Sequence, residues 1–132
     1  MRKSGKSERK KLFAKLDAVF SEYIRARDGY RCITCGTVGR EKDGIIQCGH
    51  LFSRASYSTR WSEENAFAQC RGCNLRHEHD AAPFTMFYLH RFGQGAYEKL
   101  YLKHKSVFKI TNCDIQTLIG IYEKKKAELA NV

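Results

Sequence analysis

The segment that decides the fold begins with Cys32-Ile33-Thr34-Cys35-Gly36 and ends with Cys70-Arg71-Gly72-Cys73. Two cysteines separated by two residues can bind one ion, and two such pairs complete the closed tetrahedral site that is typical of structural zinc. The alternative is that the four residues are free cysteines in a reduced core. Two C-x-x-C pairs in a chain of only 132 residues argue against this alternative. The sequence therefore predicts a structural Zn²⁺ ion bound by Cys32, Cys35, Cys70 and Cys73.

The residues between the two pairs carry the candidate chemistry. The gap is longer than the roughly 15–20 residues of a zinc ribbon, so the zinc site encloses more than a hairpin turn. Short β-like pieces are expected at residues 45–47 and 66–69. His50 follows the first piece, Asn65 opens the second, and Asn74 follows the second cysteine pair.

Helical patterns flank this segment on both sides. Residues 1–6 are expected to form a disordered basic arm, and Ser7 is a plausible N-cap for a helix over residues 7–29. Two short helices are expected at residues 84–92 and 96–103, because the glycines at 93 and 95 interrupt the pattern. A last helix begins at Thr111 and Asp114, which have capping-box spacing. Its expected buried residues are Ile115, Leu118, Ile119, Tyr122 and Leu129.

No linker or repeat divides the chain, so residues 1–132 are predicted to form a single domain. Its zinc-stapled core is expected at residues 30–80 and its helical C-terminal part at residues 81–132. A formal net charge of +10 favours nucleic acid as the partner. No apolar run approaches the roughly 18 residues of a membrane span, and we expect a cytoplasmic protein without membrane contact. The unpaired Cys48 and Cys113 are expected to be small buried apolar residues.

The order His50, Asn65, Asn74 resembles the HNH nuclease superfamily over roughly residues 30–80. The phrases CITCGT, GHLFSR, QCRGCN and FGQGAYEKL are also similar to the phage NinG (Rap) recombination proteins. The resemblance implies an α+β fold with a zinc-stapled ββα-metal core and flanking α-helices at both termini. It also implies a phage or prophage endonuclease, in the cytoplasm of a bacterial host, that cuts branched recombination intermediates such as Holliday junctions and leaves 5′-phosphate and 3′-hydroxyl ends.

The resemblance also implies roles for the three site residues. His50 would be the general base, Asn65 would brace the loop, and Asn74 would be a ligand of a catalytic Mg²⁺ or Mn²⁺ ion. A neutral imidazole can activate water near neutral pH, and an amide oxygen suits a hard cation, although Asn with His would also accept Ni²⁺.

One position departs from the motif. Many HNH proteins have an Asp or His ligand directly before the base, where this chain has Gly49. The second protein ligand is therefore open, with His77 preferred because it lies one helical turn after Asn74. The candidates are Asp43, Glu63, Glu64, His77, Glu78 and His79.

DNA contacts are expected from arginines that flank the site, because one guanidinium group can donate two hydrogen bonds to the oxygens of one phosphate. The expected phosphate ligands are Arg54, Arg60, Arg71 and Arg76. Trp61 is expected to pack in the loop rather than stack on an exposed base. A homodimer could form on the apolar faces of the terminal helices.

Two other functions fit parts of the sequence. A non-catalytic zinc-binding module that binds nucleic acid is the main alternative to a nuclease, and Gly49 favours it. A protein-interaction zinc finger would leave the positive charge unexplained.

Overall fold

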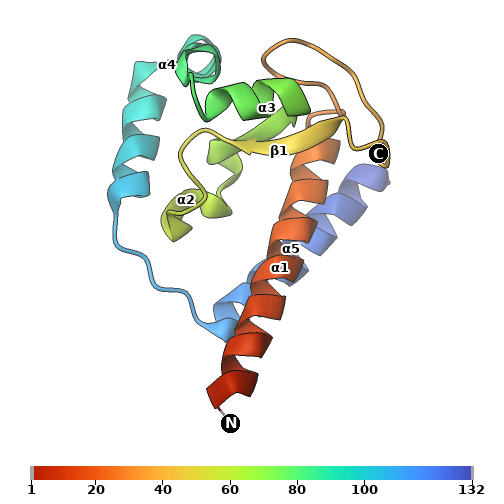
Figure 1. The fold of residues 1–132 in the computed structure, drawn as a ribbon, viewed down its shortest axis with the longest axis vertical. Helices are drawn as coiled ribbons and strands as arrows, with labels where there is room; N and C mark the ends of the chain where they lie inside the picture. Colours follow the sequence, from red (N-terminus) through yellow and green to blue (C-terminus); the bar gives the residue numbers. More distant parts are fainter. Residues whose placement is uncertain (1, 132) are drawn as a thin grey trace.

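The computed structural model describes residues 2–131, and it combines helices with one small sheet (Figure 1). The elements in chain order are α1 (Arg2–Arg27), β1 (Ile46–His50), α2 (Tyr57–Arg60), the 3₁₀ helix η1 (Glu63–Asn65), β2 (Ala66–Cys70), α3 (Arg71–His77), α4 (Ala82–Lys105) and α5 (Asn112–Ala130). The expected class, helices at both ends of a small β-containing core, is confirmed. Within the described residues, no helix is long and apolar enough to cross a membrane.

The two terminal helices, α1 and α5, lie side by side and start at the same end of the molecule (Figure 1). Arg9 of α1 donates to the Asn112 side chain at 2.9 Å, and Lys126 of α5 donates to Glu22 at 3.0 Å. Their apolar faces form the main core, which includes Leu16, Phe20, Ile24, Ile115, Ile119 and Tyr122. Each fully buried side chain of this size contributes about 1.5–3 kcal/mol. The faces expected to support a dimer are therefore used inside one chain.

The start of α1 differs from the expectation. The helix is continuous from Arg2, so the expected disordered arm is helical from that residue, and Ser7 lies inside the helix instead of capping it. Met1 lies outside the described residues. No proline interrupts this segment, and Gly5 alone costs only about 1 kcal/mol in a helix interior. The chain leaves the helix at Gly29, which has a φ of 66° that suits glycine.

The sheet positions the candidate site. Strands β1 and β2 are antiparallel, with Ile46 paired to Cys70 and His50 paired to Ala66. β1 extends to His50, three residues beyond the expected strand. Because side chains alternate along a strand, His50 faces α1 and contacts Phe20, whereas Phe67 lies on the opposite face. Helix α3 follows β2 without a loop, which gives the expected order of two strands and a helix.

The C-terminal part contains a second small core. Gly93 has a φ of 89° and ψ of 168°, so α4 is kinked where the sequence predicts a break between two helices. On both sides of the kink, α4 buries apolar side chains against Leu51 and Phe67.

The capping box of α5 is present as expected. The Thr111 side chain accepts from the backbone N–H of Asp114, and the Asp114 side chain accepts from that of Thr111. The expected burial of Leu129 is wrong, because it lies in the last turn of α5 and is 37% exposed.

Candidate functional site

The four cysteines of the two C-x-x-C pairs lie together. Their sulfur atoms are all within 4.8 Å of one another, and the sulfurs of Cys35 and Cys70 are 3.7 Å apart. With Zn–S bonds of about 2.3 Å, a tetrahedral site requires sulfur–sulfur distances of roughly 3.8 Å. The expected ligand set of Cys32, Cys35, Cys70 and Cys73 therefore could hold a metal ion, with the spacing of structural zinc.

Backbone N–H groups donate hydrogen bonds to the cysteine sulfurs, which favours their thiolate form. The N–H of Cys35 donates to the sulfur of Cys32 at 3.5 Å, and the N–H of Cys73 donates to that of Cys70 at 3.4 Å. A hydrogen bond from Thr37 lowers the pKa of the Cys35 thiol to about 6. Burial and the neighbouring sulfurs raise the pKa of the Cys73 thiol. Four thiolates this close together need a cation between them, because a cation offsets their mutual repulsion.

A groove of about 490 Å³ brings together four of the expected site residues, which are His50, Asn74, His77 and the phosphate ligand Arg54. The groove is lined by Cys48, His50, Leu51, Ser53, Arg54, Asn74, His77 and Glu78. A second groove, of about 370 Å³, shares His50 and Arg54 and adds Arg71 and Arg25. His50 therefore borders two adjoining concave surfaces.

The ring of His50 is held in one tautomer. Its Nε2 atom is 2.8 Å from the carbonyl oxygen of Arg60, and a carbonyl can only accept, so Nε2 carries the proton. The lone pair is then on Nδ1, which has no hydrogen-bond partner among residues 2–131. Burial lowers the pKa of His50, so the ring is neutral at neutral pH. The imidazole is thus prepared to accept a proton.

Asn65 holds the loop that carries this hydrogen-bond acceptor. It is fully buried, and its side-chain oxygen accepts from the N–H of Phe52 at 2.8 Å. Its side-chain nitrogen donates to the carbonyls of Phe52 at 3.0 Å and Thr59 at 3.1 Å. Asn65 does not line the groove. It ties Phe52, which follows β1, to Thr59 in α2, the residue directly before Arg60.

The structure explains the glycine that departs from the HNH motif. A Cβ atom at Gly49 would lie 2.1 Å from Oε1 and 2.8 Å from Cδ of Gln69. Gln69 is 1% exposed and donates to Thr34 at 2.9 Å, whereas its Oε1 atom is buried without a partner. The space in which a side chain at position 49 would start is occupied. A side chain at this position would have to displace the buried Gln69 side chain, which explains why no metal ligand stands here.

The candidate second ligands fall into two groups. Asp43 binds backbone N–H groups of its own loop, Glu63 is bound by Tyr23 and Lys125, and Glu64 is bound by Lys103. None of these three lines the His50 groove, and neither does His79. Only His77 and Glu78 lie there with Asn74.

The residues present fit a catalytic ion only loosely. Asn74 donates through its nitrogen to Gln47 at 2.9 Å, which leaves its oxygen for a cation. The Nε2 atom of His77 is 2.8 Å from the Leu51 carbonyl, so its lone pair is on Nδ1, which is buried without a partner. The Glu78 carboxylate is exposed. Among residues 2–131, the four cysteines are the only group of three or more His, Cys, Asp or Glu ligands close enough to hold an ion.

One of the expected phosphate ligands has a structural role instead. Arg60 forms a bidentate ion pair with Asp17 and lies over the Trp61 ring at 5.2 Å, and its side chain is 16% exposed. Trp61 is buried, donates to Asp17 at 2.9 Å, and stacks on Phe13, so its expected packing role is confirmed. Arg60 is not available to phosphate, because its guanidinium already binds a carboxylate.

Three expected phosphate ligands remain exposed, which are Arg54, Arg71 and Arg76, and the first two border the grooves beside His50. Arg54 also pairs with Asp17 at 3.5 Å, but its side chain is 63% exposed, so it can reach a phosphate more easily than Arg60 can. Arg25 also borders the second groove. Sequence reasoning did not select Arg25, because it lies on α1, more than 20 residues before His50.

The two unpaired cysteines differ from each other. Cys48 is half-buried: it packs against the main core and also lines the groove, and burial raises the pKa of its thiol to about 12. The expected burial is therefore met in part. The expectation for Cys113 is wrong: it is exposed in the first turn of α5.

Comparison with known proteins gives one match. A family model described as Bacteriophage Lambda NinG protein matches residues 1–131. Neither a curated protein nor a solved structure matches the chain.

Proposed function

Because this chain belongs to the bacteriophage lambda NinG protein family, which is related to phage recombination, we propose that it is a metal-dependent DNA endonuclease of the HNH type. Its substrates are branched recombination intermediates, such as Holliday junctions. It acts in the cytoplasm of the bacterial host. The observation that carries the proposal is the fixed neutral tautomer of His50, on a groove that also contains Asn74.

The proposed reaction is hydrolysis of a phosphodiester. His50 accepts a proton from water through Nδ1, and the water oxygen attacks phosphorus. The bond from phosphorus to the 3′ oxygen breaks, the 3′ oxygen takes a proton from solvent, and 5′-phosphate and 3′-hydroxyl ends remain. The lowered pKa of His50 keeps the base unprotonated at neutral pH.

A Mg²⁺ or Mn²⁺ ion would supply charge stabilisation at the leaving oxygen. Asn74 would hold it through its side-chain oxygen, together with Glu78 or His77. Glu78 is the better second ligand, because its carboxylate is exposed on the groove whereas the free nitrogen of His77 is buried. Substrate phosphate and water would complete the coordination, as is common for magnesium.

The zinc site and the arginines have supporting roles. Structural Zn²⁺ on the four cysteines would fix the loop after α1 to the junction of β2 and α3. Arg54 and Arg71 would bind phosphates on either side of the scissile bond, and Arg76 would extend that contact. Asn65 acts as a positioning residue through the loop that ends at Arg60.

A non-catalytic zinc-binding module that binds nucleic acid is the second candidate. Gly49 favours it, because the usual ligand is missing and Gln69 fills its place. The same arginines would bind DNA in either case. The two candidates differ in whether the bound DNA is cut.

Cleavage of labelled DNA separates these candidates. Duplex, single-stranded and four-way-junction DNA of the same sequence are incubated with the zinc-loaded protein and Mg²⁺ or Mn²⁺, or with no added divalent ion. We expect cutting that depends on the added ion and is fastest on the junction. Tight binding without cutting under every ion would refute the nuclease and support the binding module.

Symmetric cutting of a junction requires two active sites, so we propose that a homodimer forms on DNA. The apolar faces of α1 and α5 are buried against each other, so the dimer would use another surface. Light scattering with and without junction DNA tests this. A monomer mass in both states would contradict it.

A further inference from the structure

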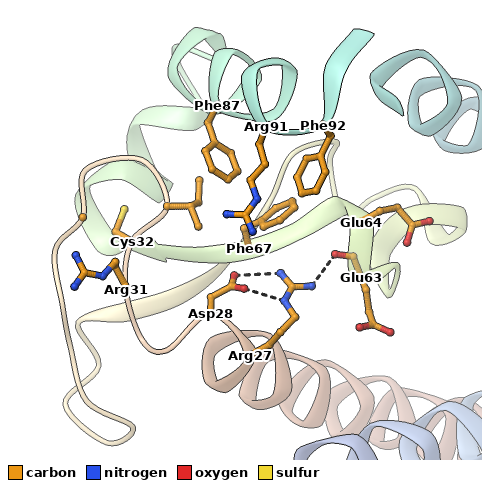
Figure 2. A pocket seen from close by; sticks show the side chains of 12 residues that line it. Arg27, Asp28, Arg31, Cys32, Glu63, Glu64, Phe67, Phe87, Arg91 and Phe92 are labelled. Carbon is orange, nitrogen blue, oxygen red and sulfur yellow. Dashed lines mark hydrogen bonds and ion pairs between the residues drawn. The ribbon is translucent and has the colours of Figure 1, made fainter. Parts of the chain in front are cut away.

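A cavity of about 850 Å³ lies away from His50. It is bounded by the end of α1, strand β2 and the kink of α4 (Figure 2). Phe67 of β2 forms part of it, and Phe67 is on the face of the sheet opposite His50. This volume is within the range of small-ligand sites, and the proposed reaction does not use the cavity.

Aromatic rings form the walls of this cavity. Phe87 and Phe92 come from α4 on either side of Arg91, and their ring centroids are 5.6 Å and 5.7 Å from that of Phe67 (Figure 2). Phe67 is buried, but Phe92 is 43% exposed. The kink at Gly93 directly follows Phe92 and ends the helical segment that carries it. A flat apolar surface is therefore left open to solvent.

The charges free to bind a ligand in the cavity are positive. Figure 2 shows the guanidinium of Arg91 between the phenylalanine rings. It lies over the Phe92 ring, 5.6 Å from its centroid, and has no hydrogen bond or ion pair with residues 2–131, so a base would stack on the other face of Phe92. Arg31, at the zinc-site end of the cavity, is also exposed and forms no ion pair within the same residues.

The acidic residues of the cavity are already engaged. The Asp28 carboxylate accepts from Arg27 at 2.8 Å and from the N–H of Ala68 at 2.8 Å. Glu63 is bound by Lys125 and Glu64 by Lys103, and both carboxylates point away from Arg91 (Figure 2). An anionic ligand among the rings would therefore meet the unpaired guanidinium of Arg91, whereas Arg31 lies at the zinc-site rim of the cavity and its guanidinium points away from the rings (Figure 2).

We propose that this cavity binds an unpaired nucleotide of branched DNA. The base stacks on Phe92 and the phosphate of the same nucleotide binds Arg91, while Arg31 at the rim is left for a neighbouring phosphate of the strand. In duplex DNA the faces of the bases are covered by their neighbours, so only unpaired nucleotides present a free face to the ring. The proposal rests on DNA being the substrate, and it gives the protein a means to recognise strand exchange points. An acidic peptide is the competing ligand.

Binding measurements on two variants test this site. Phe92→Leu keeps an apolar side chain but removes the ring, and Arg91→Gln removes the free charge. Lys99→Gln, on the exposed side of the same helix and outside the cavity, is the matched charge control. Dissociation constants are measured with zinc-loaded protein for an oligo-dT of about 20 nucleotides and for a duplex of equal length, without added divalent ion so that neither is cut.

We expect each cavity variant to bind the single strand about tenfold more weakly. Affinity for the duplex should change less than about twofold in Phe92→Leu, and Lys99→Gln should affect both DNAs equally. Unchanged single-strand affinity, or equal losses on both DNAs, would overturn the proposal, and the first result would leave an acidic peptide as the ligand. Because binding is measured without cleavage, failure of the nuclease proposal is seen separately, as wild-type protein that binds DNA but never cuts it.

Discussion

Gly49→Ala tests the packing that excludes a side chain before the proposed base. The new Cβ would lie 2.1 Å from Oε1, 2.8 Å from Cδ and 3.1 Å from Cγ of Gln69. Three close atoms of one buried side chain must move together, and Gln69 is only 1% exposed. Moving them also breaks the hydrogen bond that Gln69 donates to Thr34.

Overpacking of this kind costs about 1–3 kcal/mol. For a chain of this length, we expect the melting temperature to fall by roughly 3–10 °C. Thermal unfolding is followed by circular dichroism, with zinc in slight excess in every sample. Gly120→Ala is the matched control, because Gly120 is an exposed helical position with open space around it, and alanine there should stabilise α5 by about 0.5–1 kcal/mol.

A second variant separates steric conflict from other effects of Gly49→Ala. In a Gln69→Ala background the conflict is absent, so adding Gly49→Ala should cost much less than it does in the wild type. If Gly49→Ala has the same melting temperature as the wild type, the Gln69 side chain moves aside at little cost. The missing metal ligand would then need a different explanation.

Three further predictions follow from the zinc site, the arginine at Asp17 and the pKa of His50. Elemental analysis should find one Zn²⁺ per chain. Cys32→Ser should abolish both bound zinc and the folded circular dichroism spectrum, because zinc binding supplies folding free energy on the order of 10 kcal/mol. A variant that is folded without zinc would contradict this. Arg60→Gln should lower the free energy of unfolding, measured by urea denaturation, by about 2 kcal/mol, because it leaves the Asp17 carboxylate without its bidentate partner. An unchanged urea midpoint would contradict the structural role and make Arg60 a candidate phosphate ligand again. Single-turnover cleavage should be lost as the pH falls through a value below 6.5, because burial lowers the pKa of His50 and the neutral ring is the active form. The stability contributed by the neutral ring is lost over the same acid range. A midpoint of the cleavage profile above pH 6.5 would exclude His50 as the titrating base.

The zinc ligands and most helices were predictable from local pattern. Four cysteines in two C-x-x-C pairs define a ligand set through spacing alone, and Thr111 with Asp114 defines a helix start. Gly93 likewise marks the kink in α4. Each cysteine pair, the helix start and the kink depend on residues within a few positions of one another, and the repeated C-x-x-C spacing is enough to link the two distant pairs.

The failures depend on contacts between distant segments. Arg60 looks like a free surface charge until α1 places Asp17 beside it. Gly49 looks like a lost ligand until the pairing of β1 with β2 places Gln69 against it. The aromatic cavity was missed for the same reason, since Phe67 and Phe92 meet only through the packing of α4 on the sheet.

The start of α1 shows a different limit of sequence reasoning. A basic segment without apolar residues gives no periodic signal, so Arg2 to Lys6 were assigned to an arm, although nothing in them prevents continuation of the helix.

The most direct test of the proposed nuclease is single-turnover cleavage of a four-way junction with Mg²⁺ by wild type and by His50→Ala, with the dissociation constant measured on the same samples. We predict that the variant binds the junction as tightly as the wild type but cuts it at least about 100-fold more slowly, because it lacks the general base. Equal cleavage rates at equal affinity would show that His50 is not the base, and the assignment of the groove as the active site would fail with it.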